Sequence, residues 1–398
     1  MSDSNVKSMP APMPVPSVLK SICLVAIVVG LFAFGYLLSS DQDRAWHAYL
    51  TGYFYFFIIA IGGLFFTGIQ HLVRAGWSVN IRRFSEALTA YLPVAFVGGL
   101  ILLIGGKHLW EWMDSAKVHA DPLLEHKASY LNTVFFVVRM VAFFGLWMLF
   151  TKKLVGGSLA QDKSGDDSIS EKSVGWAVGC ILTFALSFSL FSVDLIMSLE
   201  PRWFSTIFGV YCFAGLFQST IATMILLILY CRKKGLLAGY VDENHLHDLG
   251  KFLFAFTVFW AYIAYSQYML IWYANLPEET LFYMPRVTGS WMYVSAALLL
   301  FKFVVPFLAL LSRRNKRNPA FLGVICVLIL IMQYVDLYWL IYPNLNGEKV
   351  IFGLPEILVW LGFGGIFLFT VTRFLGTHAI VPFRDPRIHE SLHHHVTY

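Results

Sequence analysis

Long runs of apolar residues recur ten times along the chain, separated by short polar segments. Each run has roughly 20 or more residues, which lets a helix cross a hydrocarbon core about 30 Å thick. The runs do not alternate at every second position, so a helical bundle is favoured over a barrel. The pattern predicts membrane-spanning helices over residues 17–38, 45–72, 84–105, 129–152, 174–198, 204–231, 249–274, 287–312, 319–342 and 354–376.

These runs predict an all-α membrane protein with one polytopic domain. Residues 1–16 form an N-terminal segment, residues 17–376 the ten-helix region and residues 377–398 a C-terminal tail. We expect spans 2–5 and spans 6–9 to form two four-helix bundles, with spans 1 and 10 peripheral to them.

Composition and charge agree with a membrane protein. The chain is 58% hydrophobic and 13% charged, whereas soluble domains carry about 25% charged residues. Of the 29 Lys and Arg residues, 20, including Lys7, fall on one side of the predicted membrane and 7 on the other. The positive-inside rule therefore places both termini in the cytoplasm. Because topology explains the net charge of +5, it gives no reason to expect a nucleic-acid partner.

The cysteines and histidines do not form cofactor motifs. No two of the five cysteines have C-x-x-C spacing, which disfavours an iron–sulfur cluster or covalently attached haem on this chain. His47 and His71 lie at opposite edges of the second span, so they cannot ligate one b-type haem. We expect this chain to hold no cofactor and no metal.

The sequence also predicts the character of two loops and of the tail. The inner loop over 156–172 is rich in Gly, Ser and Asp and is predicted to be mobile. The outer loop over 106–128 is predicted to contain an interfacial helix, anchored by Trp110 and Trp112. The end of the tail, with three consecutive histidines at 393–395, is expected to be disordered.

Two opposite charges lie inside spans 4 and 5. An ionisable residue inside a membrane span indicates a pathway or a site, because burying its charge is costly. Counted from the span ends, Arg139 and Asp194 differ in depth by roughly 9 Å. A direct contact would then need the full reach of the arginine, or a bridging water.

Spans 8 and 9 carry a second set of polar groups. Lys302 lies near mid-membrane, and Pro306 should bend its helix by leaving the Lys302 carbonyl without a donor. Gln333 and Asp336 lie one turn apart on span 9. Lys302 is deeper than Asp336 by roughly 13 Å on the same count, which suits successive groups of a proton relay better than one ion pair.

Two readings of these groups stay open. His71 and Glu86, near the cytoplasmic face, form a candidate proton entry, because His titrates near neutrality and a carboxyl beside lipid has a raised pKa. Alternatively His71 and Glu86 are merely interfacial, and the buried charges form a structural network that fixes helix registry.

A weak internal repeat links the two predicted bundles. The third helix of each carries a buried cation, Arg139 or Lys302, and the fourth carries an aspartate, Asp194 or Asp336. Parallel repeats of this kind occur in membrane proteins, although two matching charges can also arise by coincidence.

Three stretches carry a family resemblance. They are GGLFFTGIQHLVRAGWSVNIRRFSEALTAYLP at 62–93, SVDLIMSLEPRWFSTIFGVYCFAGLFQS at 192–219 and WAYIAYSQYMLIWYANLPEET at 260–280. With ten spans and both termini inside, the chain resembles the NrfD-like, polysulfide-reductase-type membrane subunits. Among these it looks closest to the F-type subunit of alternative complex III, a quinol:cytochrome c (or other acceptor) oxidoreductase.

The resemblance implies a respiratory complex in the bacterial inner membrane. Its partners would be a homologous membrane subunit that oxidises quinol, an iron–sulfur subunit, c-type haem subunits, lipids and, in some cases, a terminal oxidase. The chain itself would carry no cofactor and would contribute a proton path. Its candidate residues are His71, Glu86, Arg139, Asp194, Lys302, Gln333 and Asp336.

The outer mouth offers an alternative redox role. A quinol head group needs hydrogen-bond partners, one of which accepts a proton, and Asp114, His119 or Asp121 could supply them. Glu200, Glu278 and Glu279 are expected instead to dock an outer subunit. A stand-alone secondary transporter is the second alternative, although it should show broken helices at matching positions of two halves.

Overall fold

The computed structural model describes residues 10–347 and 349–395, and this part of the chain contains helices and no strand. Lys7, with the rest of residues 1–9, and residues 396–398 of the predicted tail lie outside the described residues. Ten helical segments within the described ranges are long and apolar enough to cross a membrane. The predicted all-α membrane fold is therefore confirmed.

The ten spans are built from helices with the following bounds. They are α1 (Ser17–Ser40), α2 (Gln42–Leu72), α3 (Val79–Leu88) with η1 (Thr89–Tyr91) and α4 (Leu92–Leu102), α8 (Thr133–Ser164), α9 (Ser168–Leu195) with η3 (Met197–Leu199), α10 (Phe208–Lys233), α11 (Glu243–Ala274), α14 (Trp291–Ala297) with η4 (Leu298–Val304) and α15 (Val305–Leu311), α17 (Pro319–Ile341) with α18 (Pro343–Asn346), and α19 (Leu354–Thr377). Short helices fill the connections: α5 (Gly106–Leu109), η2 (Glu111–Met113), α6 (Ser115–Ala120), α7 (Pro122–Lys127), α12 (Pro277–Thr280), α13 (Met284–Val287), α16 (Arg313–Arg317) and α20 (Ile388–Leu392).

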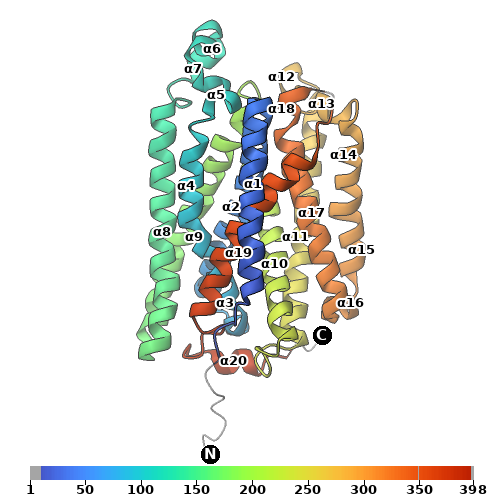
Figure 1. Ribbon diagram of the computed structural model, residues 1–398. Coiled ribbons are helices and arrows are strands. Elements are labelled where there is room, and N and C mark those ends of the chain that lie inside the picture. The colour runs from blue at the N-terminus through green and yellow to red at the C-terminus, as the bar shows by residue number, and fades with distance from the viewer. Residues whose placement is uncertain (1–9, 348, 396–398) are drawn as a thin grey trace, which may run out of the picture.

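The long helices stand side by side in two groups (Figure 1). The first group contains α2, the α3–α4 segment, α8 and α9, and the second contains α10, α11, the α14–α15 segment and α17. Helix α1 packs along α19 outside them, so both expected bundles and both peripheral helices are present. The described chain begins and ends at the same end of the molecule, which we call the basic side because most Lys and Arg residues gather there. The other end is called the opposite side.

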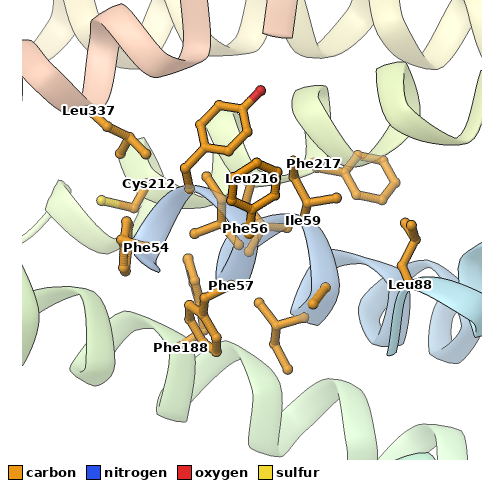
Figure 2. Close-up of a cluster of buried hydrophobic side chains, with 14 of the residues drawn as sticks. Phe54, Phe56, Phe57, Ile59, Leu88, Phe188, Cys212, Leu216, Phe217 and Leu337 are labelled. Carbon is orange, nitrogen blue, oxygen red and sulfur yellow. The ribbon is translucent and has the colours of Figure 1, made fainter. Parts of the chain in front are cut away.

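Helix α2 is the centre of the packing. Nearly nine-tenths of its most apolar window is buried, and it contacts α3, α9, α10, α17 and α19. Figure 2 shows Phe54, Phe57 and Ile59 of this helix among side chains of α9 and α10. Since lipid is as apolar as the helices, their association depends on close packing.

Glycines in α2 permit that close approach. A Cβ at Gly62 would lie 2.0 Å from the Thr220 hydroxyl oxygen on α10, and one at Gly63 would lie 2.5 Å from the Ser85 carbonyl oxygen on α3. Both distances are far inside van der Waals contact. Neighbouring helices therefore meet α2 at positions that only glycine allows.

The eighth span has a local irregularity where the sequence predicts a bend. Residues Leu298–Val304, which include Lys302, form a π-helical segment directly before Pro306. Proline has no backbone N–H, so the regular i to i+4 ladder cannot continue through it. The π segment is how this helix absorbs the proline, and such segments are frequent at functional sites.

The predicted mobile inner loop is instead mostly helix, so that prediction is wrong. Helix α8 continues to Ser164 and α9 begins at Ser168. Gly165, with φ of +70°, ends α8, and Gln161 donates hydrogen bonds to Ser170 and to the Asp166 carbonyl across the turn. Antiparallel pairing of α8 with α9 thus outweighs the low helix propensity of the glycines.

The outer loop also differs from its expectation. It folds into four short helical segments, α5, η2, α6 and α7, rather than one interfacial helix. Trp110 and Trp112 are buried against Phe136, and the Trp110 indole N–H donates to the Leu195 carbonyl at 3.2 Å. The tryptophans therefore anchor the loop to the protein itself.

We predict that Gly62→Ala lowers the stability of the protein by about 1–3 kcal/mol, the usual cost of overpacking a close contact. Gly145→Ala is the matched control, because a Cβ at Gly145 meets nothing within 4 Å and alanine favours helix. Thermal unfolding in one detergent measures both. Equal melting temperatures for the two variants would contradict the role of Gly62 in helix packing.

Candidate functional site

The interior of the second bundle holds a buried ion pair. The Lys302 ammonium lies 2.5 Å from Asp336 Oδ2 and donates to Gln333 Oε1 at 2.9 Å, and Lys302 is 0% exposed. The Tyr211 hydroxyl donates to the other carboxylate oxygen of Asp336. The ammonium also lies 4.5 Å from the ring centre of Trp260. The aspartate is thus held between a cation and a phenol, both of which carry protons.

The first bundle holds an equivalent pair. Arg139 on α8 donates to both carboxylate oxygens of Asp194 on α9, at 2.8 and 3.0 Å. Its third nitrogen donates to the Tyr130 carbonyl at 3.0 Å, and its guanidinium stacks 3.9 Å from the Tyr130 ring centre. Such a two-pronged pair satisfies both charges away from water.

The direct pairing corrects the depths counted along the sequence. Arg139 with Asp194, and Lys302 with Asp336, are single ion pairs rather than groups separated by roughly 9 and 13 Å. Counting residues from span ends assumes straight, upright helices and neglects the reach of long side chains. The π segment around Lys302 adds to this error by changing the rise of its helix. In both bundles the cation on the third helix pairs with the aspartate on the fourth, at the matching positions noted for the repeat.

A third set of buried charges lies on the basic side. Glu86 accepts from Arg82 at 3.3 Å and from Arg83 at 2.7 Å. Arg82 also donates to Asp385 at 2.7 Å, and Arg83 pairs with Asp162. We call these five residues the basic-side ion cluster. Glu86 is 0% exposed between two guanidinium groups, so the expectation of a carboxyl beside lipid is wrong.

His71 is buried near this cluster without bonding to Glu86. Its Nε2 atom has no hydrogen-bond partner among the described residues. In the sequence Arg82 and Arg83 serve only as topology signals, although each lies one helical turn from Glu86. Asp162 and Asp385 come from distant segments, and no local pattern identifies them as part of the cluster.

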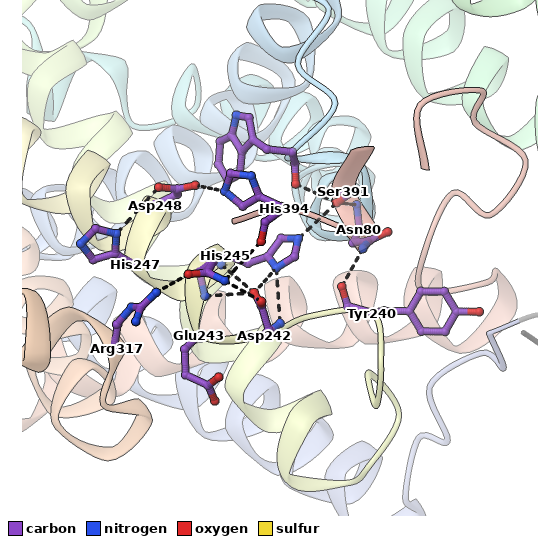
Figure 3. Close-up of polar contacts among 12 residues, drawn as sticks. Asn80, Tyr240, Asp242, Glu243, His245, His247, Asp248, Arg317, Ser391 and His394 are labelled. Carbon is purple, nitrogen blue, oxygen red and sulfur yellow. Dashed lines mark hydrogen bonds and ion pairs between the residues drawn. The ribbon is translucent and has the colours of Figure 1, made fainter. Parts of the chain in front are cut away.

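The C-terminal tail is docked, so the expected disorder at residues 393–395 is wrong. Figure 3 shows His394 pointing at Asp248, and the distance from Nε2 to Oδ2 is 2.5 Å. Ser391 donates to the Trp77 carbonyl at 2.8 Å and accepts from the Asn80 N–H at 3.2 Å. The tail thereby covers the basic-side ends of α3 and α11.

Arg82 anchors this tail electrostatically through Asp385. Burial alone raises the pKa of the Asp385 carboxyl. The charge of Arg82, the Arg387 backbone N–H and the Arg82 hydrogen bond outweigh burial and hold that pKa below its usual value. The carboxyl is therefore ionised in the docked tail at neutral pH.

A polar cavity of about 320 Å³ opens on the opposite side. Its lining includes Asp43, His108, Glu111, Glu200 and Arg202. His108 lies 2.6 Å from Asp43, and Arg202 donates to Glu111 at 2.8 Å. Burial raises the pKa of Glu200, and the positive charges of Arg286 and Arg202 only partly offset it. Glu200, expected to dock an outer subunit, thus lines a cavity that holds several proton-accepting groups.

Arg286 lies close to this cavity and is a site residue that the sequence analysis did not single out. It is buried and donates to the carbonyls of Trp339 at 3.1 Å and Leu340 at 2.9 Å on α17. Burial lowers the pKa of Arg286 to about 9, while nearby Tyr283, Glu200 and Tyr211 act in the opposite direction. Arg286 therefore fastens the start of the Lys302 span to the end of the Asp336 helix.

The three candidate quinone residues do not line this cavity. Asp114 accepts from the Ala116 N–H at 3.0 Å, and Asp121 accepts from the Leu123 N–H at 2.9 Å, so each caps a short helix. Asp121 also accepts from Arg202 at 2.9 Å. His119 is exposed. The structure gives these residues capping and surface roles and does not bring them together around one pocket.

Glu278 and Glu279 lie in the short helix α12 on the opposite side, where Glu278 is exposed and Glu279 is partly so. Their expected docking role stays a prediction.

We predict that Arg139→Met lowers stability by about 3–5 kcal/mol, because it leaves the Asp194 charge buried without a partner. The double variant Arg139→Met/Asp194→Asn removes that charge and should recover most of the loss. Chemical unfolding of both variants in detergent measures the difference. If the double variant unfolds at no higher denaturant concentration than the single variant, the two residues do not couple as their geometry indicates.

We predict that Asp385→Asn loosens the tail at pH 7. A carboxyl with a depressed pKa contributes stability that is present above its unfolded value of about 3.9 and is lost as pH falls through the folded value. The variant and the unmodified protein should therefore differ at neutral pH and converge as the pH falls through the depressed pKa of Asp385. Hydrogen exchange of residues 380–394 measures this, with the exposed Asp167→Asn as control. A pH-independent difference would exclude the electrostatic anchor.

No protein-family model matches this chain, and no curated protein shows significant similarity to it.

Proposed function

We propose that this chain is a proton-conducting membrane subunit of a respiratory quinol:cytochrome c, or other acceptor, oxidoreductase. The observation that carries the proposal is the buried Lys302–Asp336 pair with the Tyr211 hydroxyl on its second carboxylate oxygen. The resemblance to NrfD-like subunits supplies the type of complex, and the residues supply the proton chemistry.

The pair is suited to proton transfer because its two groups are in direct contact and can exchange a proton. Desolvation penalises each charge of a buried ion pair, while their mutual attraction compensates for much of that cost. Moving one proton from the ammonium to the carboxylate makes both groups neutral over a distance of 2.5 Å. A change in nearby charge can then shift the balance between the two states.

Groups toward the opposite side offer a route between this pair and the surface. Tyr211 contacts Asp336, and Arg286 lies near both Tyr211 and Glu200. Glu200 lines the polar cavity, where Asp43 and His108 also lie. Tyr211 and Glu200 are therefore the proton-carrying groups proposed between the buried aspartate and the cavity, and Arg286 contributes a positive charge near both.

Groups toward the basic side are polar but less completely paired. Gln218 on α10 donates to the Thr257 hydroxyl at 2.9 Å, while its side-chain oxygen has no partner in the described chain. The Nε2 atom of His71 and the side-chain oxygen of Gln70 are likewise buried without partners there. Buried polar atoms of this kind are where ordered water binds in protein interiors. These groups are the proposed proton entry from the basic side.

In this proposal the electron-transfer chemistry belongs to other subunits. A homologous membrane subunit would oxidise quinol, and iron–sulfur and c-type haem subunits would carry the electrons. The complex would sit in the bacterial inner membrane with the basic side facing the cytoplasm. A quinol site on this chain itself is the weaker alternative, because Asp114, His119 and Asp121 do not converge on the cavity.

A stand-alone secondary transporter is the second alternative. The π segment at Lys302 is the observation that favours it, since transporters place broken helices at mid-membrane. Helix α8, in the matching position of the first bundle, is a continuous α-helix from Thr133 to Ser164. Purification from native membranes separates the two ideas, because a complex subunit copurifies with haem-bearing partners and a transporter does not.

We predict that Asp336→Asn and Tyr211→Phe reduce the protons translocated per electron in the native complex, reconstituted in vesicles. Quinol oxidation measured with an uncoupler should be largely retained, because neither residue would touch the quinol. Tyr334→Phe is the matched control, a buried tyrosine on α17 that makes no hydrogen bond to Asp336.

Equal loss of proton translocation and quinol oxidation, in a complex that still assembles, would argue for a redox role of this site. Failure of the Asp336→Asn complex to assemble, with normal coupling in Tyr211→Phe, would make the ion pair structural.

A further inference from the structure

Two cavities meet where helices α1 and α19 approach the basic side. The first has a volume of about 450 Å³, and its lining includes Lys20 on α1 and Arg373 on α19. The second, of about 540 Å³, lies between α1, α2, α10, α17 and α19. Met13 and Thr372 line both cavities, so the two are neighbours. We call them the cationic cavity and the apolar groove.

The cationic cavity has positive charge that the described protein does not neutralise. Lys20 and Arg373 are both exposed, and neither forms an ion pair with a residue in the described ranges. Pro16 precedes the first turn of α1 and gives it no side-chain cap. The positive end of the α1 dipole therefore adds to the two side-chain charges.

The apolar groove has the opposite character. Its lining is almost entirely hydrocarbon, with Ile22, Leu226 and Val327 among the residues that contribute. On α19 the lining runs from Trp360 to Thr372, a rise of about 18 Å along the helix. One leaflet of the hydrocarbon core is about 15 Å deep. The groove thus extends through roughly one leaflet from the basic side.

The N-terminal segment joins the two cavities. Met13 is buried, and its N–H donates to the Leu375 carbonyl at 2.9 Å near the end of α19. The Met13 sulfur also lies 3.7 Å from the Cys231 sulfur at the end of α10. A molecule in both cavities would therefore contact the N-terminal segment, the peripheral α1–α19 pair and the central helices together.

We infer that the two cavities form the binding site of one anionic phospholipid. Its phosphate lies in the cationic cavity against Lys20 and Arg373, and one acyl chain lies in the apolar groove. Charge complementarity favours an anionic head group, because each cation near an anionic lipid contributes favourably to the free energy of binding. The apolar groove accommodates one acyl chain of the lipid, because the groove is apolar and lies at the depth of the acyl layer. This site does not depend on the proposed proton path.

The test uses the full-length protein in nanodiscs that contain phosphatidylglycerol and phosphatidylcholine. Native mass spectrometry counts the lipids of each class that stay bound. The unmodified protein should retain one phosphatidylglycerol, preferred over phosphatidylcholine by about 30-fold for two cations. Lys20→Gln/Arg373→Gln should remove this preference. The control Lys233→Gln/Lys234→Gln, which changes two exposed cations on the same side, should keep it.

A second variant tests binding of the acyl chain in the apolar groove without altering the charge of the protein. Val327→Trp places an indole in the apolar groove. The control is Val324→Trp, because Val324 lies one helical turn away and does not line the groove. Val324 is also more exposed than Val327, at 67% against 46% of the residue surface. We expect Val327→Trp to lower retention of the bound lipid at least tenfold and Val324→Trp to leave it unchanged.

The inference would be overturned by equal retention of the two lipids by the unmodified protein, by equal effects of the two charge variants, or by unchanged retention in Val327→Trp. Displacement of the lipid by glycerol 3-phosphate alone at low concentration would also overturn it, since it would indicate a free phosphate site.

Discussion

The cost of placing charge inside a bilayer is the constraint on which this structure depends. Each ionised group away from water must find a partner within the protein, and the chain supplies one from a neighbouring helix or, for Arg82, from the C-terminal tail. Arg139 meets Asp194, and Lys302 meets Asp336. At the membrane edge Arg44 meets Glu356, and Arg82 meets Asp385. These pairs add specific links between segments that close packing of the apolar helices also holds together.

The two interior pairs differ in what they can do. Arg139 holds Asp194 in a two-pronged pair, and an arginine does not release its proton in proteins. Lysine can lose its proton when buried, and its aspartate partner also contacts a phenol. The π segment and Pro306 lie only on the lysine helix. Under the proposed function, the same repeat position carries a structural pair in one bundle and a proton-transferring pair in the other.

The sequence predicted the ten spans and the helices that carry the buried charges, because length, hydropathy and isolated charges are local signals. It did not predict that the pairs touch, since depth counted along a helix neglects tilt, side-chain reach and the π segment. It also missed Asp162 and Asp385, which join Arg83 and Arg82 from distant segments. Arg286 was missed because its partners are backbone carbonyls of Trp339 and Leu340, which leave no mark in a sequence.

The most direct test of the central claim is the protonation state of Asp336 during turnover. Infrared difference spectra of the native complex, compared with those of Asp336→Asn, isolate the carbonyl stretch of this carboxyl. Proton conduction through the Lys302–Asp336 pair predicts a protonated-carboxyl band that appears and decays with quinol oxidation and is missing in the variant. A carboxylate that stays ionised throughout turnover would contradict that account and would leave the pair a structural link between the eighth and ninth spans.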